Sequence, residues 1–536
     1  MSSPRGDMTL DYDLPPLEAA GVPRARQMLE RARWAARAFA TYDRDSVLRI
    51  VSAVTRAAED KAEHYAEWAV RETGFGVVAD KVVKNRLCSR GILDAYRHHD
   101  YVTPRVDDDK KMVEVPQPAG VVFALTPSTN PVSTVYFKVI LSLLTRNAVV
   151  VSPHPYAKEC CSDAARVLAE AAVGAGAPDG VVQWVEEPSV PLIDALMTDP
   201  RTDVILATGG VAVVRAAYSS GNPAIGVGPG NVPVLVDATA DLPRAAKKLV
   251  DSKAFDNSIL CTNESVLIVE EAVADRLLRE MSRHGAHLLD SDERDRVRDT
   301  VFPGGRFDTS MVGKDAATIA GKAGVRTSPR TRILLAPFDL AVKEEPLAHE
   351  KLCPVLGVTR VPTARRGIRT AEALLRIGGA GHSAVIHSND PHTVMEYAAA
   401  VDVLRVTVNE GGSTGSAGFG TNLAPSMTIG TGFVGRSSLS ENLEPKHLVN
   451  VSRIAYSTDP SEVMPSFDGI TPWAAPTSSV PQYPLPSTVT SNVTNLALAE
   501  SAQVPSLIRA PGDGAAEIRE ELRRLIIEEL TTIIKG

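Results

Sequence analysis

A cysteine follows a glycine-rich segment at a spacing that suggests covalent chemistry beside a nucleotide. Cys261 lies in the polar stretch 255–264, about thirty residues after the run Gly226-Val227-Gly228-Pro229-Gly230-Asn231. A thiolate in such a place can attack an electrophilic carbon, whereas most cysteines are small buried hydrophobic residues without reactivity. The spacing alone leaves both interpretations of Cys261 open.

Polar residues also follow apolar runs, at places where the strands of open α/β sheets end and bind ligands. In the segment 125–131, Asn130 either caps the following helix, with Pro131 in its first turn, or donates its amide to a developing oxyanion. In the segment 152–155, His154 stands between two prolines and is either a turn residue or a ligand.

Two glycine-rich segments fit the same pattern. The segment 207–210, Ala-Thr-Gly-Gly, opens a predicted helix, and backbone N–H groups at a helix N-terminus favour phosphate. The segment 226–233 permits close backbone approach to a ligand, although it also fits a simple turn between strands.

Short apolar runs alternate with helical patterns from residue 120 onward, which predicts a parallel sheet covered by helices on both faces. The expected strands are at 120–125, 148–151, 181–185 and 204–207, and the expected helices at 132–144, 157–175, 191–197 and 211–219. A second α/β block runs from about 234 to about 442, with strands at 265–269 and 384–387. Upstream, we expect helices at 24–39 and 46–70 and an exposed hairpin or arm at 100–118.

The composition changes sharply beyond residue 457. Residues 459–512 contain nine prolines, many serines and threonines and little charge, which favours an extended linker. Residues 513–536 carry apolar side chains at three- and four-residue spacing, which predicts an amphipathic helix. This helix either packs on its own domain or binds a partner protein.

The overall composition narrows the classes of function. The chain has 536 residues, 44% of them hydrophobic, and a net charge of -8 without a basic stripe, so we expect no nucleic-acid partner. Its five cysteines lack metal-ligand spacing, which predicts reduced thiols and no metal site. The start lacks a secretory pattern and the apolar stretch 139–151 is too short to span a bilayer, so we expect a cytoplasmic protein without a membrane partner.

Taken together and in this order, the motifs resemble those of the CoA-acylating branch of the aldehyde dehydrogenase superfamily. The resemblance covers residues 20–456 and rests on the segments PSTNP, TRNAVVVSPHP, ILATGG, AYSSGNPAIGVGPGNVP, AFDNSILC, HEKLCPVL, GGAGHSA and LSENLEPKHLVN. It implies an α/β fold with a Rossmann-like, parallel-sheet nucleotide-binding domain, an α/β catalytic domain and a β arm for oligomerisation.

The resemblance also implies domain limits. We expect the N-terminal helices and the dinucleotide-binding domain in 1–240, including the oligomerisation arm at 100–118, and the catalytic domain in 241–445. A C-terminal arm strand at 446–458, the Pro/Ser/Thr-rich linker at 459–512 and the amphipathic targeting helix at 513–536 complete the chain. The expected assembly is a homodimer or homotetramer.

Site residues follow from the same resemblance. It implies that Cys261 is the nucleophile, that Asn130 is the oxyanion amide and that Glu350 holds the nicotinamide ribose. His382 lies in a motif typical of the acylating branch, with its role left open. The expected cofactor-binding residues are Thr126, Pro127, Ser128, Ser152, His154, Pro155, Thr208, Gly209, Gly210, Gly228, Glu350 and His382.

The sequence departs from the hydrolytic members of the superfamily at an informative position. Those enzymes carry a glutamate six residues before a proline, where it activates the deacylating water, and the same count back from Pro233 gives Val227. Valine cannot act as a base, so an acyl-thioester would persist until CoA accepts it. Val214 and Ser152-Pro153-His154 also replace residues that usually contact the nucleotide, which leaves NAD or NADP open.

These points predict an enzyme that oxidises a small aldehyde, of the acetaldehyde or propionaldehyde type, with NAD and coenzyme A through a Cys261 thioester and ping-pong kinetics. The alternatives are an acylating sulfoacetaldehyde dehydrogenase, a hydrolytic aldehyde dehydrogenase, a non-catalytic scaffold, or the same reaction in reverse. The tail resembles the encapsulation peptides of bacterial microcompartment enzymes. It implies a location inside a microcompartment, with a shell or cargo protein bound through 513–536.

Overall fold

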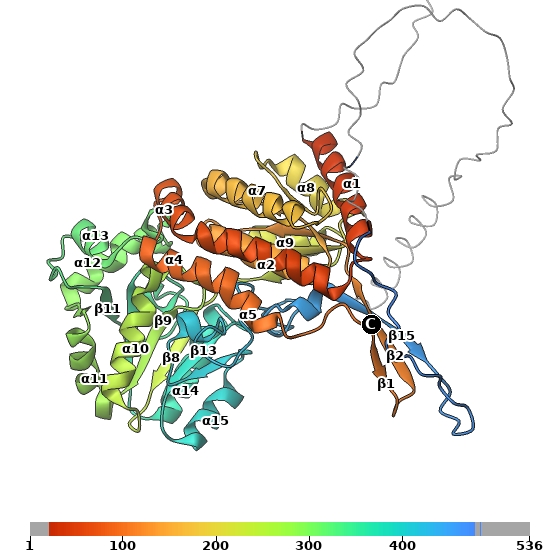
Figure 1. Ribbon diagram of the computed structural model, residues 1–536. Helices are drawn as coiled ribbons and strands as arrows, with labels where there is room; N and C mark the ends of the chain where they lie inside the picture. Colours follow the sequence, from red (N-terminus) through yellow and green to blue (C-terminus); the bar gives the residue numbers. More distant parts are fainter. Residues whose placement is uncertain (1–20, 478–482, 484–536) are drawn as a thin grey trace, which may run out of the picture. The chain divides into compact units, whose positions relative to one another are not determined.

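The computed structural model describes residues 21–477 and Tyr483. Much of the linker predicted at 459–512 and all of the helix predicted at 513–536 lie outside these described residues. Two parallel sheets, a small antiparallel sheet and the surrounding helices form a mixed α/β fold, as predicted (Figure 1). In the described part of the chain, no helix is both long and apolar enough to cross a lipid bilayer.

A group of helices precedes the first sheet: α1 (Val22–Phe39), α2 (Arg44–Asp60), α3 (Ala62–Thr73), α4 (Val78–Arg86) and α5 (Ile92–Tyr96). The single helix predicted over 46–70 is in fact two, because the chain leaves helical geometry at Lys61, with φ −103° and ψ 7°. Ala58, Ala62 and Tyr65 are all buried across this break. The apolar spacing therefore continues through the interruption and could not reveal it.

The first sheet has the strand order β5-β4-β3-β6-β7, and every pairing in it is parallel. Its chain neighbours β3 and β4 are buried along their whole length, as expected of strands covered by helices on both faces. β4 and β5 follow on one side of β3, and the next strand in the chain, β6, pairs with the other side of β3. This reversal creates a switch point between the ends of β3 and β6, where open α/β sheets bind ligands. The elements are β3 (Val121–Leu125), α6 (Pro131–Leu144), β4 (Ala148–Ser152), α7 (Lys158–Gly174), β5 (Val182–Trp184), α8 (Val190–Thr198), β6 (Val204–Thr208), α9 (Val211–Ser219) and β7 (Ala224–Val227).

The second sheet has the order β10-β11-β12-β9-β8-β13-β14 and is also parallel throughout. Because the strands are parallel, their amino ends share one edge of the sheet. The elements are β8 (Val232–Val236), α10 (Leu242–Ala254), β9 (Glu264–Glu270), α11 (Glu271–Arg283), β10 (Ala286–Leu288), α12 (Ser291–Val301), α13 (Ala316–Lys322), β11 (Ile333–Pro337), β12 (Val355–Val361), α14 (Ala364–Ile377), β13 (Ala384–His387), α15 (Pro391–Ala400), β14 (Val406–Val408) and α16 (Gly412–Gly415).

The second sheet begins with β8, inside which the second α/β block was expected to start, at about residue 234. β8 pairs with β9 and β13 of this sheet, and the domain limit at residue 240 stays a prediction. The chain passes from one sheet to the other in the short connection Gly228–Asn231, between the carboxyl end of β7 and the amino end of β8. An apolar strand has the same pattern in either sheet, so only its pairing decides where it belongs.

The predicted arm is a three-stranded antiparallel sheet of β1 (Arg105–Asp107), β2 (Met112–Pro118) and β15 (Val449–Ala455). The three strands extend side by side beyond the first sheet and its helices (Figure 1). Most side chains of β15 are exposed. The hairpin and the C-terminal arm strand are therefore present, and their part in oligomerisation stays a prediction.

The first part of the predicted linker lies against the folded body, and we call residues 457–477 the anchor segment. Ala474 forms a two-bond bridge with the chain around Tyr42: its carbonyl accepts from Asp43 N at 3.3 Å and its N–H donates to Thr41 O at 3.2 Å. The ring of Trp473 lies 4.5 Å from the guanidinium carbon of the buried Arg146, a cation–π contact. The composition predicted a linker here, but it could not show that the Ala474 backbone and the Trp473 ring attach this part to the body.

Candidate active site

Cys261 lies in the short segment between α10 and β9, at the amino edge of the second sheet. Of the five cysteines, Cys88, Cys160, Cys161 and Cys353 are buried and only Cys261 is partly exposed. A nucleophile must reach its substrate, so this exposure separates Cys261 from the cysteines that fill the cores.

The backbone just before Cys261 has an unusual conformation. Asp256, Asn257 and Ser258 have φ values of 48°, 51° and 63°, in the left-handed region that non-glycine residues rarely adopt. Such a backbone persists where the surroundings hold it, and it is frequent at functional sites. Here Asp256 Oδ1 accepts a 2.6 Å hydrogen bond from Val77 N, and Asn257 Nδ2 donates to Gly313 O at 2.8 Å. Contacts from two distant segments therefore fix the turn that leads to the thiol.

Residues of three other loops meet Cys261 at the same edge of the sheet. Gly230 precedes β8, Glu350 precedes β12 and His382 precedes β13, as Cys261 precedes β9. A Cβ atom on Gly230 would lie 2.1 Å from the carbonyl oxygen of Cys261 and 3.5 Å from Cε1 of His382. Glu350 Oε1 accepts a hydrogen bond from Gly230 N at 3.2 Å. The structure therefore brings Cys261, Glu350 and His382 together around a glycine.

The charges at this site are strongly affected by burial. Burial, together with the nearby negative charge of Glu350, raises the pKa of the Cys261 thiol to about 12. Burial raises the pKa of Glu350 to about 8, against the opposing effect of the Gly230 hydrogen bond. In the protein without ligands, the thiol is therefore protonated near neutral pH, and a base must remove its proton before attack.

His382 is a neutral imidazole close to the loop that carries Cys261. Burial, aided by the positive charge of Arg405, lowers the pKa of His382 to about 3. Its Nδ1 lies 3.1 Å from Ser383 Oγ, while its buried Nε2 has no partner among the described residues. At neutral pH the ring is therefore uncharged, and with so low a pKa it takes up a proton only weakly.

Arg405 fixes the loop that carries His382. Its guanidinium is 3% exposed and donates to the carbonyl oxygens of His382 at 2.7 Å, Gly381 at 2.9 Å and Gly430 at 2.6 Å. Its charge also lowers the pKa of Cys261, although this effect is smaller than that of burial. Sequence reasoning missed Arg405, because an arginine before a strand carries no local signal of such a role.

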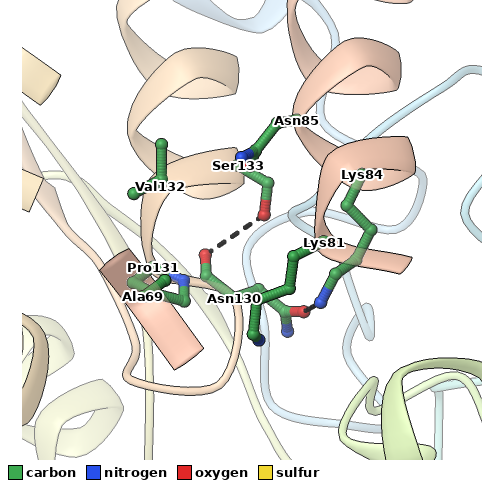
Figure 2. A pocket seen from close by; sticks show the side chains of 8 residues that line it. All are labelled: Ala69, Lys81, Lys84, Asn85, Asn130, Pro131, Val132 and Ser133. Carbon is green, nitrogen blue, oxygen red and sulfur yellow. Dashed lines mark hydrogen bonds between the residues drawn. The ribbon is translucent and has the colours of Figure 1, made fainter. Parts of the chain in front are cut away.

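Asn130 precedes α6, with Pro131 in the first turn as predicted. Its side chain does not cap the helix. Instead, its Oδ1 accepts a 2.6 Å hydrogen bond from Lys84 Nζ on α4 (Figure 2). Its Nδ2 lies 3.3 Å from Thr129 Oγ1. Lys84 also pairs with Asp256 of the turn before Cys261. The structure therefore links Asn130 to the thiol segment through a lysine that sequence reasoning did not identify.

Apart from Glu350 and His382, the residues predicted to bind the nucleotide lie at or just beyond the carboxyl edge of the first sheet. Thr126, Pro127 and Ser128 follow β3, Ser152 ends β4, and Thr208 ends β6, so these groups flank the switch point between β3 and β6. The hydroxyls of Thr126 and Ser152 are buried and have no partner among the described residues.

Two glycines at this edge leave room for a ligand. No atom lies within 4 Å of a Cβ placed on Gly210, which precedes α9, or on Gly228. Gly209 meets only side-chain atoms of Val213, at 3.8 Å. The N-terminus of α9, where the two glycines add no side-chain bulk, is a suitable cradle for a diphosphate.

Two of the predicted nucleotide contacts have structural roles. His154 Nδ1 accepts a 3.2 Å hydrogen bond from Tyr156 N, which caps the short helical turn that begins at Pro155. Ser152 is 1% exposed and its carbonyl accepts from Thr126 N at 3.0 Å. Both residues thus support the loops at this edge, and nucleotide contact by their side chains stays a prediction.

Val227 is the last residue of β7, where it is buried and pairs with Thr208. The position that carries the deacylating base in hydrolytic relatives is therefore part of a strand with an apolar side chain. The carboxylate that influences Cys261 is that of Glu350, and it arrives from a different loop.

Comparison with known proteins agrees with this geometry. The model of the aldehyde dehydrogenase family matches residues 16–304. The bifunctional aldehyde-alcohol dehydrogenase AdhE of Escherichia coli (strain K12) is 38% identical over 82% of this chain and 50% of its own length, so the chain spans about half of that relative. The succinate-semialdehyde dehydrogenase (acetylating) of Clostridium kluyveri is 34% identical over 83% of this chain and 98% of its own length.

Solved structures are similar as well. An acetylating aldehyde dehydrogenase from Geobacillus thermoglucosidasius has a TM-score of 0.80 and 36% identity, over 83% of this chain and 98% of its own. A propionaldehyde dehydrogenase from the fucose utilisation bacterial microcompartment of Clostridium phytofermentans has a TM-score of 0.74 and 29% identity, over 81% and 97%. The Rhodopseudomonas palustris propionaldehyde dehydrogenase, solved with bound CoA and an acylated cysteine, has a TM-score of 0.73 and 28% identity, over 81% and 97%. With its accessible thiol at the edge of a parallel sheet and acylating enzymes among its relatives, this chain belongs to the aldehyde dehydrogenase family.

Proposed function

We propose that this protein is a CoA-acylating aldehyde dehydrogenase that oxidises a small aldehyde to its acyl-CoA with NAD as the electron acceptor. The observation that carries the proposal is that Cys261 is partly exposed while an apolar residue, Val227, occupies the position of the hydrolytic base. The chain has one accessible thiol, and it has an apolar strand residue where a hydrolytic enzyme needs a base.

The reaction begins when a base removes the proton of Cys261. His382 brings an unpaired Nε2 close to the loop of the thiol, but burial and Arg405 lower the pKa of its ring to about 3, so it is a weak base for this step. The thiolate then attacks the aldehyde carbonyl and forms a thiohemiacetal, whose oxygen carries the developing negative charge. The Asn130 side-chain amide donates to this oxygen.

The bound nicotinamide supplies the acceptor for the hydride that leaves the thiohemiacetal carbon, so that a thioester remains on Cys261. The carboxyl-edge residues at the ends of β3 and β6 and the open N-terminus of α9 fit a dinucleotide, with Glu350 near the reactive end. The CoA thiolate then attacks the thioester, the acyl group moves to CoA, and Cys261 leaves as a thiolate that can begin the next cycle.

Transfer to CoA is favoured over hydrolysis because the site supplies no dedicated base for water. Glu350 is the nearby carboxylate, but its Oε1 accepts the Gly230 N–H and its pKa is raised to about 8. Both effects oppose a role as a carboxylate base at neutral pH. Hydrolytic activity is the alternative, and it would appear as turnover that does not depend on CoA.

A small, uncharged aldehyde is the substrate class that we favour. Lys81 and Lys84 lie beside Asn130, but both pair with Asp256, so part of their charge is already balanced. A sulfonate or carboxylate on the substrate would need a cation that such pairing does not supply. Sulfoacetaldehyde is the second candidate, because an arginine or lysine elsewhere could serve it.

The experiment for this function is a panel of aldehydes assayed for NADH formation with and without CoA, and with NAD or NADP. We expect acetaldehyde or propionaldehyde to give fast turnover that requires CoA. Equal rates with and without CoA would contradict the acylating function, and faster turnover of sulfoacetaldehyde would move the substrate class to the second candidate.

We further propose that residues 513–536 attach the enzyme to a microcompartment shell or cargo protein. Support comes from the amphipathic spacing in that segment and from the microcompartment relative described above. The full chain should associate with a shell protein in a co-expression pull-down, and a chain that stops after Tyr483 should keep its turnover and lose this association. Equal association of both chains would contradict the proposal.

A further inference from the structure

A buried cluster of charges lies between α4, the loop after β3 and the turn before Cys261. Lys81 and Lys84 are each 3% exposed and Asp256 is fully buried. Both ammonium groups pair with Asp256 Oδ2, Lys81 at 3.2 Å and Lys84 in closer contact. Charges that have left water are tolerated only where they are paired and hydrogen-bonded, so the positions of these groups are tightly constrained.

Within this cluster, Lys84 determines which way the Asn130 amide points. A lysine ammonium can only donate, so the atom that faces Lys84 Nζ at 2.6 Å must be the amide oxygen of Asn130. The amide nitrogen then points away from Lys84 (Figure 2). It lies 3.3 Å from Thr129 Oγ1. That contact uses one of its two N–H groups and leaves the other for a ligand.

Asp256 connects the cluster to the segment that carries the thiol. Asp256 is the first of the three residues with positive φ before Cys261. Besides the two lysines, its carboxylate accepts from Val77 N at 2.6 Å, and its own N–H donates to Asp80 Oδ2 at 2.7 Å. Lys84 is therefore the side chain that contacts both the amide and the carboxylate of the turn.

We propose that Lys84 is a positioning residue for the reaction, which orients the Asn130 amide so that one N–H faces the substrate oxygen; this rests on the function proposed above. Its charge also polarises the amide and makes that N–H a stronger donor. Lys84 does not touch the substrate in this scheme. It acts through Asn130, whereas Lys81 holds only Asp256 and the carbonyl oxygen of Thr129.

A double-mutant cycle on the full-length enzyme tests this role. Asn130→Ala removes the amide and should lower kcat by about 10²- to 10³-fold, the usual loss for one oxyanion donor. Lys84→Met keeps the length of the side chain without its charge and should lower kcat by roughly 10- to 100-fold. In the Asn130→Ala background, Lys84→Met should cost less than about a further twofold, because its effect passes through the missing amide.

Lys81→Met is the matched control for the cost of removing a buried charge. It lies on the same helix, has the same exposure and loses the same carboxylate partner. Whatever loss it causes should be equal in the wild-type and Asn130→Ala backgrounds, because Lys81 does not contact the amide. Thermal melting verifies that each variant is folded, and Lys84→Arg replaces Lys84→Met in the cycle if the latter does not fold.

Alkylation of Cys261 by iodoacetamide distinguishes an effect of Lys84 through Asn130 from an effect through Asp256. Alkylation needs the thiol but no oxyanion donor, so Lys84→Met should change its rate by less than about twofold while turnover falls. Alkylation that slows as much as turnover would show that Lys84 acts through Asp256 and the turn, and would overturn the proposal. Equal losses from Lys84→Met in both backgrounds would overturn it too, whereas a fully active Asn130→Ala enzyme would overturn the role of Asn130 itself.

Discussion

Gly230 donates its backbone N–H to Glu350 Oε1 at 3.2 Å, while its α-carbon faces the carbonyl oxygen of Cys261. The connection between the two sheets therefore touches both the thiol segment and the carboxyl group that influences the thiol. A side chain of any size at this point must displace one of these neighbours.

Gly230→Ala should impair turnover severely. The added Cβ would lie 2.1 Å from the Cys261 carbonyl oxygen, a backbone atom that cannot move without moving the thiol. We expect a loss of about 10²-fold or more in kcat/KM, since misplacement of a reacting group by about 1 Å has that effect. Gly321→Ala on α13 is the matched control, because nothing lies within 4 Å of its Cβ. Gly230→Ala with near wild-type kinetics would contradict the close packing.

Glu350→Gln should make the Cys261 thiol easier to ionise. The carboxyl of Glu350 titrates with a pKa of about 8, so above this pH its negative charge opposes the thiolate and raises the thiol pKa. Removing the charge should lower the thiol pKa by about one unit, or about tenfold more thiolate at a given alkaline pH. The measurement is the iodoacetamide alkylation rate of Cys261 from neutral to alkaline pH. The exposed Glu344→Gln should leave that profile unchanged, and slower alkylation of Glu350→Gln would contradict the sign.

Cys261→Ala should abolish aldehyde oxidation and leave the fold intact. Cys261 is only partly exposed and its side chain is small, so its loss removes little packing. Turnover should fall below detection while the melting temperature stays within a few degrees of the wild-type value. The buried Cys88→Ala tests the opposite case, with lower stability and retained turnover. Substantial activity in Cys261→Ala would place the nucleophile at another residue.

Steady-state kinetics should follow a ping-pong pattern. The acyl group stays on Cys261 after the hydride has left, and the proposed site offers no base to release it to water. Double-reciprocal plots with NAD and CoA as the varied substrates should therefore be parallel. Intersecting lines would mean that CoA binds before the reduced nucleotide leaves, and would contradict this order.

Trp473→Ala should loosen the anchor segment without affecting catalysis. Its ring covers the guanidinium of Arg146, and such a desolvated cation–π contact contributes about 1–2 kcal/mol. We expect a loss of that size in the free energy of unfolding, measured with urea, and an unchanged kcat. Val463→Ala in the same segment is the control, because its side chain is 84% exposed. Equal stability of the two variants would show that the indole does not hold the segment.

The local pattern of the sequence predicted most elements of the first sheet, and the two strands named for the second sheet, to within one or two residues. The run 120–125 is β3 (Val121–Leu125), and the helix expected at 132–144 is α6 (Pro131–Leu144). These limits depend on short-range features, such as Pro131 in the first turn of α6. The assignment of β8 to a sheet depends on its partners β9 and β13, which lie farther along the chain, so the sequence could place the start of the second block only approximately, at about residue 234.

In the candidate site, too, residues in recognisable local segments were predicted, whereas contacts between distant residues were not. Cys261, Glu350 and His382 stand in recognisable segments, and the structure brings them together. Lys84 and Asp256 are 172 residues apart, so their contact has no local signature. For Asn130, the sequence left a helix cap and an oxyanion donor as alternatives. The side chain does not cap the helix, and a lysine binds its amide oxygen, which no local pattern could reveal.

The four-residue connection Gly228–Asn231 has a thermodynamic consequence. It starts at the edge predicted to hold the nucleotide and ends at Asn231, whose Nδ2 donates to Ala348 O at 3.0 Å, next to the loop of Glu350. A ligand that shifts this connection must therefore change the reactivity of Cys261. Because linked equilibria are reciprocal, a group attached to Cys261 must change the affinity for that ligand by the same factor. Binding of the nucleotide and attachment of a group to Cys261 are thus thermodynamically coupled.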